Sequence, residues 1–157
     1  PYKHVVACVD FSENSAKAVQ SALHIAAQDR ADLDCLYVYQ SALALSLDYG
    51  GYAPPLPTGP DEEALKTWQS DLDKFIEQLV RAKGDVKVRT LVKERVNIRE
   101  TILEHVEETK ADIVVLGTRG KTGLRELLIG TTAEKIVQHA PCSILAVKPD
   151  EMAAAAE

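Results

Sequence analysis

Short apolar runs alternate with helix-like segments along this chain, and the alternation limits the fold more than any other feature. Five runs have the length and apolar character of buried strands: His4 to Val9, Leu33 to Tyr39, Val86 to Val92, Asp112 to Leu116 and Ser143 to Val147. Strands that alternate with helices form a parallel sheet with helices on both faces. The sequence therefore predicts a single doubly wound α/β domain with a five-stranded parallel sheet.

Four helices are expected between these runs, over about Ser12 to Asp29, Asp61 to Lys83, Asn97 to Lys110 and Thr131 to His139. Ser12 is a residue type that commonly caps the N-terminus of a helix. Asn97 with Glu100, and Thr131 with Glu134, have the three-residue spacing of a capping box. These side chains predict where three of the four helices begin.

The length of 157 residues suits one domain over residues 1–150, followed by a frayed tail at 151–157. Residues 41–60 form a long loop rich in Gly and Pro, and such loops usually have a function or are disordered. Because we find no secretory signal and no membrane-spanning run, we expect a cytoplasmic protein without membrane insertion. The net charge of −6 argues against general binding of nucleic acid. Cys8, Cys35 and Cys142 lie in apolar runs without metal-ligand spacing, and we expect buried, reduced thiols.

Glycines gather directly after the fourth apolar run. Gly117, Gly120 and Gly123 lie within seven residues, and Gly130 precedes the last expected helix. Glycine lets the backbone approach a phosphate closely, and a helix N-terminus adds unpaired N–H groups and a partial positive charge. Basic residues, Arg119 among them, lie in the same loop. The segment therefore predicts an anion site.

Two common phosphate-binding motifs do not fit this segment. A P-loop would need a glycine five residues before Gly120, where the chain has Val115. The dinucleotide-binding fingerprint needs a different glycine spacing and follows the first strand of its unit. The chain is thus predicted to be neither a P-loop NTPase nor a Rossmann dehydrogenase.

The spacing of Gly117, two residues, Gly120, nine residues, Gly130 and then Thr131 resembles the nucleotide-binding signature of the universal stress protein family, in its ATP-binding branch. The resemblance covers nearly the whole chain. The stretches that are similar to the family's first, second and last strands are Val5 to Ser12, Leu36 to Val38 and Ala140 to Val147. The last stretch has Pro-Cys where many members have Cys-Pro. The resemblance implies the strand order 3-2-1-4-5.

The resemblance also implies a set of ATP-binding residues: Val9, Asp10, Val38, Gly117, Arg119, Gly120, Gly130, Thr131 and Thr132. In the family, the counterpart of Asp10 contacts the ribose or adenine side, and the backbone at Val38 meets adenine. The glycines and threonines bind phosphate through N–H groups and hydroxyls. Asp10 is the obvious carboxylate near this cradle, so Mg²⁺ is expected to be held mainly by phosphates and water.

Several of these residues also have an interpretation that needs no ligand. Asp10 suits a turn after a strand, and Thr131 suits a helix cap. Gly117 can relieve crowding where a strand leaves the sheet, and Gly120 can simply form a turn. The conjunction of glycine spacing, a preceding strand and a following helix favours nucleotide binding.

Fast phosphoryl transfer needs an oriented nucleophile and charge stabilisation, and the sequence offers no general base with a defined partner. We therefore predict an ATP-dependent regulatory protein in a stress response, with at most slow hydrolysis. A nucleotide-hydrolysing or adenylyl-transferring enzyme that uses Asp48 of the 41–60 loop is one alternative, and a nucleotide-free structural dimer is a second. The family commonly pairs through its last strand, which implies a homodimer through Ser143 to Val147, in addition to an unknown protein partner.

Overall fold

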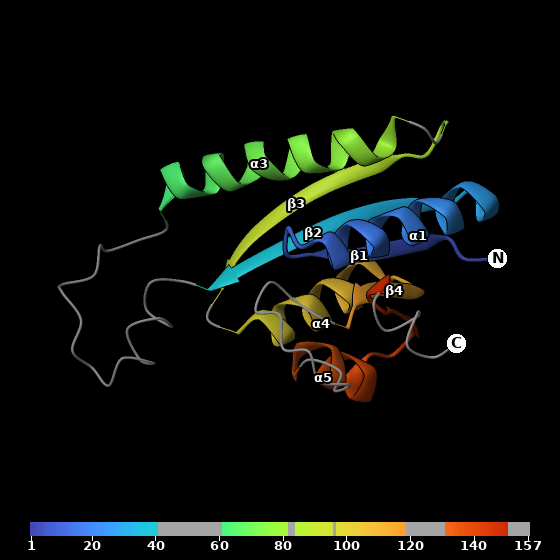
Figure 1. Ribbon diagram of the computed structural model, residues 1–157. Coiled ribbons are helices and arrows are strands. Elements are labelled where there is room, and N and C mark those ends of the chain that lie inside the picture. Colours follow the sequence, from blue (N-terminus) through green and yellow to red (C-terminus); the bar gives the residue numbers. More distant parts are fainter. Residues whose placement is uncertain (41–60, 82–83, 96, 119–130, 151–157) are drawn as a thin grey trace.

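The structure, a computed structural model, describes residues 1–40, 61–81, 84–95, 97–118 and 131–150 of the chain (Figure 1). Within them the chain forms five strands and four helices. In chain order they are β1 (His4–Val9), α1 (Glu13–Asp29), β2 (Asp32–Gln40), α3 (Glu62–Val80), β3 (Val88–Arg95), α4 (Ile98–Thr109), β4 (Ile113–Gly117), α5 (Thr131–His139) and β5 (Ser143–Val147). The loop at 41–60 and the tail at 151–157 lie outside the described residues.

All five strands are parallel, and their order in the sheet is β3-β2-β1-β4-β5. The predicted fold and strand order are therefore confirmed. Val6 of β1 pairs with Asp34 on one side and with Val114 on the other. The strand order reverses between β1 and β4, and the carboxyl ends of these two strands lie next to each other. In doubly wound sheets this is the point where ligands bind.

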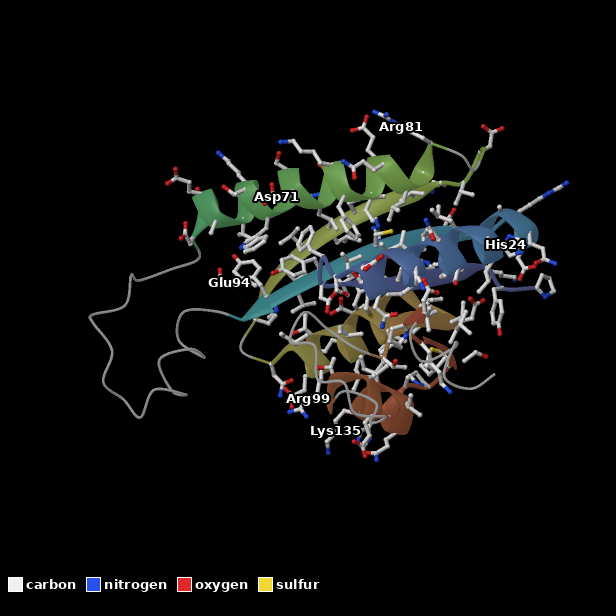
Figure 2. The ribbon with its side chains drawn as sticks, viewed as in Figure 1. His24, Asp71, Arg81, Glu94, Arg99 and Lys135 are labelled. Atoms are coloured by element: carbon white, nitrogen blue, oxygen red, sulfur yellow. The ribbon has the colours of Figure 1, made fainter. Side chains whose placement is uncertain are left out.

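Helices α1 and α3 cover one face of the sheet, and α4 and α5 cover the other (Figure 1). The first face buries residues such as Val5 and Leu72, and the second buries residues such as Val6 and Ile136. Strands buried on both faces explain the nearly continuous apolar runs in the sequence. Charged side chains such as Arg81 and Lys135 point away from the sheet into solvent (Figure 2).

Two of the predicted helix starts are visible as caps. The side chain of Ser12 accepts a hydrogen bond from the N–H of Ser15 at 3.0 Å, and that of Asn97 accepts one from Glu100 at 3.2 Å. Helix α5 is described from Thr131 onward, and the residues before it lie outside the described part, so the predicted cap at its start stays a prediction.

Strand β3 is shifted toward the C-terminus relative to the predicted Val86 to Val92. It runs from Val88 to Arg95, because it pairs with β2 from Leu33 as far as Gln40. Its last three residues are the charged Lys93, Glu94 and Arg95, which give no apolar pattern that could indicate a strand. Helix α3 ends at Val80 rather than near Lys83. No helix among the described residues is long and apolar enough to cross a membrane.

Candidate functional site

Asp10 follows β1 at the point where the strand order reverses, and its carboxylate is held by the turn that follows. Its Oδ1 accepts hydrogen bonds from the backbone N–H of Ser12, at 2.9 Å, and from the Ser12 hydroxyl. Ser12 is in turn the N-cap of α1. Between them, Phe11 has a left-handed backbone with φ of 62°. The strand end, the turn and the helix cap are therefore one connected unit.

Gly117 ends β4 beside this turn, and the structure requires a small residue there. A Cβ built on Gly117 would lie 2.6 Å from Nδ2 and 3.0 Å from Cγ of the buried Asn14 side chain. Relief of crowding was one interpretation of Gly117 that needs no ligand. Such crowding is present, and its source is helix α1. The same close approach brings the end of β4 against the first turn of α1, beside Asp10.

Thr118 is a candidate site residue that was not predicted from the sequence. Its side chain is buried at 5% exposure, and its Oγ1 has no hydrogen-bond partner among the described residues. Its backbone N–H donates to the carbonyl of Val147 at 3.0 Å, which fixes the residue at the edge of the sheet. Buried hydroxyls are nearly always paired, so an unpaired one beside Gly117 needs an explanation. A hydroxyl residue directly after the first glycine of the motif was the available signal.

Val9 and Val38 are both buried, but their side chains belong to opposite faces of the sheet. Val9 packs with the α1 and α3 side, and Val38 packs with the α4 and α5 side. The two side chains therefore cannot line one common slot, and a contact from both residues to one ligand would have to use backbone atoms of at least one of them.

The remaining predicted site residues are only partly covered by the structure. Arg119, Gly120 and Gly130 lie outside the described residues. Thr131 and Thr132 form the start of α5, and the side chain of Thr132 is partly buried. The structure thus brings together Asp10, Gly117 and the newly found Thr118, and leaves the middle of the glycine segment as a prediction.

A second polar cluster lies near the amino ends of the strands. Asp34 is buried at 2% exposure, and its Oδ2 is within 2.9 Å of Nε2 of both His4 and His105. Arg89 donates to both carboxylate oxygens, at 2.9 Å to Oδ1 and 2.7 Å to Oδ2. Because a carboxylate only accepts, each imidazole must carry its proton on Nε2. Burial alone would raise the pKa of Asp34, but the hydrogen bonds from His105, Arg89 and His4 hold it well below its usual value.

This cluster was not predicted from the sequence, although one signal existed. Asp34 is an acid inside an otherwise apolar strand, and such a residue must find partners when it is buried. Its position near the amino end of β2 separates it from Asp10 at the other end of the sheet. We therefore regard the cluster as part of the scaffold rather than of the site.

The three cysteines lie in β1, in β2 and directly before β5. Burial raises the pKa of Cys35 to about 12, with a smaller contribution from the negative charge of Asp34. Its thiol is therefore protonated at neutral pH, as expected of an interior cysteine. Cys8, Cys35 and Cys142 are all free thiols, of which Cys35 is fully buried. Among the described residues, no three His, Cys, Asp or Glu side chains are placed to hold a metal ion.

The fold and the open edge at β1 and β4 define a class, the doubly wound parallel α/β proteins with a ligand edge beyond the central strands. Within that class the chain belongs to the universal stress protein family, whose sequence model matches residues 1–148.

Known proteins agree with this assignment. Universal stress protein MJ0531 of Methanocaldococcus jannaschii is 33% identical over 147 residues, covering 94% of this chain and 82% of that protein. The structure of universal stress protein UspA from Lactobacillus plantarum is similar, with a TM-score of 0.72 at 22% identity, over 93% of this chain and 97% of that one. A universal stress protein solved in complex with cAMP has a TM-score of 0.66 at 23% identity, over 93% of this chain and 97% of that one. The two structural likenesses support the fold.

Proposed function

We propose that this chain binds an adenine nucleotide, foremost ATP, beyond the carboxyl ends of β1 and β4. The observation that carries the proposal is the buried Thr118 hydroxyl, which has no partner among the described residues and adjoins Gly117 where the strand order reverses. A bound ligand would supply the missing hydrogen bond. The cAMP complex of a structurally similar universal stress protein makes an adenine nucleotide the first ligand to test.

The proposed binding residues keep the roles that the family resemblance implies. Asp10 is a carboxylate acceptor that suits the ribose hydroxyls, and the backbone at Val9 or Val38 would flank adenine. Phosphate oxygens would be bound by N–H groups and side chains of the glycine segment and the start of α5, through Gly117, Arg119, Gly120, Gly130, Thr131 and Thr132. When bound, Mg²⁺ would neutralise phosphate charge and would be held mainly by the phosphates and water.

We further propose that nucleotide occupancy is a regulatory signal in a stress response and that hydrolysis is slow. The carboxylate of Asp10 already accepts hydrogen bonds from Ser12, and a carboxylate held in this way suits an orienting contact better than proton transfer. A turnover number well above about 1 s⁻¹ would overturn this part of the proposal.

The first experiment is the thermal midpoint of the purified chain with and without MgATP. Ligand at about 100 times its dissociation constant should stabilise the fold by roughly 2.7 kcal/mol, or about 5–10 °C for a chain of this size. Gly130→Asp places a negative charge in the proposed phosphate cradle and should abolish the shift. Gly84→Asp is the control for an added charge outside the cradle. A Cβ there has no atom within 4 Å, but the φ of 62° strains any residue other than glycine, so this variant's own midpoint should fall.

The two variants separate specific from general effects of charge. The proposal requires that Gly84→Asp, whatever its own midpoint, keeps the full MgATP-induced shift. Absence of a shift in the wild type, with no nucleotide carried through purification, would refute nucleotide binding and favour the nucleotide-free dimer.

We also propose a homodimer that forms through β5. This strand is at the end of the sheet and pairs with β4 on one side, so its other side is open among the described residues. Its Leu145 side chain is 36% exposed. An open apolar edge strand is an aggregation hazard unless something covers it. Sedimentation should detect a dimer that Leu145→Lys weakens. A wild-type monomer at all concentrations would refute this assembly.

A further inference from the structure

Aromatic rings gather on one side of the sheet, at the carboxyl end of β1. The cluster contains both phenylalanines of the chain, its single tryptophan and two of its five tyrosines. Its members, here called the aromatic cluster, are Phe11, Tyr37, Tyr39, Trp68 and Phe75. They come from the turn after β1, from β2 and from α3. The cluster therefore joins helix α3 to the turn that carries Asp10.

Phe11 makes three ring contacts within this cluster. Its ring centroid is 4.7 Å from that of Tyr37 in an edge-on arrangement, and 5.4 Å from that of Phe75, also edge-on. It stacks on Trp68 at 5.7 Å with an interplanar angle of 29°. Aromatic pairs at such separations attract each other beyond simple burial of area. The side chain of Phe11 is thus held from three directions.

The backbone of Phe11 is unusual for its residue type. Its φ of 62° lies in the left-handed region, which an L-residue other than glycine populates roughly tenfold less than the right-handed one. Among the described residues, two other non-glycine residues have positive φ, Arg30 and Lys110. They are the C-caps of α1 and α4, and this conformation is common at helix C-termini. Phe11 precedes a helix N-cap, so no such local reason applies to it.

We propose that Phe11 is a positioning residue for the nucleotide, and this inference rests on the proposed function above. The aromatic cluster holds Phe11 in the left-handed conformation. That conformation turns Ser12 back toward Asp10, so that the N–H and hydroxyl of Ser12 bind Oδ1. The rings therefore set the direction of the Asp10 carboxylate before any ligand arrives, and Phe11 itself touches no ligand.

Two substitutions at Phe11 separate the ring from the backbone. In Phe11→Ala the turn loses its anchor and is expected to spend about one tenth of its time in the competent conformation, which raises the dissociation constant for MgATP about tenfold. Phe11→Gly loses the same ring, but glycine adopts positive φ without steric cost. We expect its dissociation constant to stay within about threefold of the wild type.

Phe75→Ala is the matched control, because it removes a ring of the same cluster from the regular helix α3 and leaves Phe11 its own ring and its contacts with Tyr37 and Trp68. It should lower the thermal midpoint yet leave the dissociation constant within about twofold of the wild type. Calorimetric titration with MgATP, run well below each variant's midpoint, measures all four proteins. If Phe11→Ala does not fold, Phe11→Leu replaces it, since leucine keeps apolar volume but is equally disfavoured at positive φ.

Each result decides the proposal. Equal affinities for Phe11→Ala and Phe75→Ala would overturn it, because the ring would then matter for stability alone. Equally weak binding by the alanine and glycine variants would overturn it too, because the backbone conformation would not be the cause. A wild type that binds no MgATP refutes the proposed function itself, an outcome distinct from binding that is unaffected at Phe11.

Discussion

The buried carboxylate of Asp34 allows the forces that hold the sheet together to be tested by one substitution. Asp34→Asn keeps the size and shape of the side chain but removes its charge. The new amide presents two N–H groups toward donors that now bind a carboxylate, namely the guanidinium of Arg89 and Nε2 of the buried His105. A donor that faces the new N–H groups must therefore lose its acceptor or, in the case of an imidazole, change its tautomer.

The magnitude follows from how buried each partner is. Removing one member of a buried ion pair typically costs 3–5 kcal/mol. The Arg89 side chain is 57% exposed and can be solvated by water, whereas that of His105 is 3% exposed and cannot. The lower end, about 3 kcal/mol, is thus expected. For a chain of this length that lowers the thermal midpoint by about 6–12 °C.

Urea denaturation at pH 7 measures this free energy of unfolding directly. Asp32→Asn is the matched control, since Asp32 lies two residues earlier on the same strand, is 54% exposed and faces Lys87 at 3.6 Å. An exposed pair of this kind contributes at most about 1 kcal/mol. Equal losses from the two substitutions would refute our account of the Asp34 cluster.

The contribution of Asp34 should also depend on pH in one direction. Its pKa is lowered in the folded chain from an ordinary value of 3.8. A lowered pKa stabilises the fold above the ordinary value, and this stabilisation is lost as the pH falls below it. The Asp34 charge should therefore contribute fully above about pH 5 and progressively less below pH 4. An undiminished contribution at pH 2.5 would contradict the assignment.

Three further predictions concern the site and its surroundings. Gly117→Ala forces a Cβ to within 2.6 Å of Asn14 and should cost about 1–3 kcal/mol in urea denaturation, a loss that Asn14→Ala in the same chain should partly restore. Thr118→Val removes a hydroxyl without a partner among the described residues, so the unliganded fold should lose no stability while the MgATP-induced shift of the thermal midpoint decreases. Cys35, whose pKa is raised to about 12, should resist alkylation by iodoacetamide at pH 7.5 in the native state and react after unfolding; fast native labelling would contradict its burial.

The parts of the fold that sequence predicted well are those with a local cause. Ser12 and Asn97 cap helices through bonds to residues only three positions away. Apolar runs mark β1, β4 and β5 because both faces of a central strand, or one face of an edge strand, are covered by helices. These signals are read within a few residues and need no knowledge of the partner strand.

The parts that sequence missed depend on contacts between distant residues. The polar end of β3 is a strand because β2 continues beside it to Gln40, paired with Arg95. Asp34 meets His4 and His105 across 30 and 71 residues of sequence. Likewise the glycine spacing pointed to Gly117, but only the packing of α1 shows that Asn14 crowds it. Such contacts follow from the register of the sheet and from the packing of helices α1 and α4 on it, which one sequence does not specify.

The amino and carboxyl edges of the sheet, where the strands begin and end, differ in how completely their polar groups are paired. At the amino edge both carboxylate oxygens of Asp34 accept hydrogen bonds from protein donors. Asp112 accepts from the backbone N–H groups of Lys3 and His4 at 2.8 and 3.0 Å. At the carboxyl edge the Thr118 hydroxyl is buried without a partner among the described residues. Folded chains seldom leave such groups unpaired unless something else completes the bonding. Changes at Asp34 should therefore alter the free energy of unfolding but not the affinity of the folded chain for nucleotide, and changes at Thr118 should do the reverse.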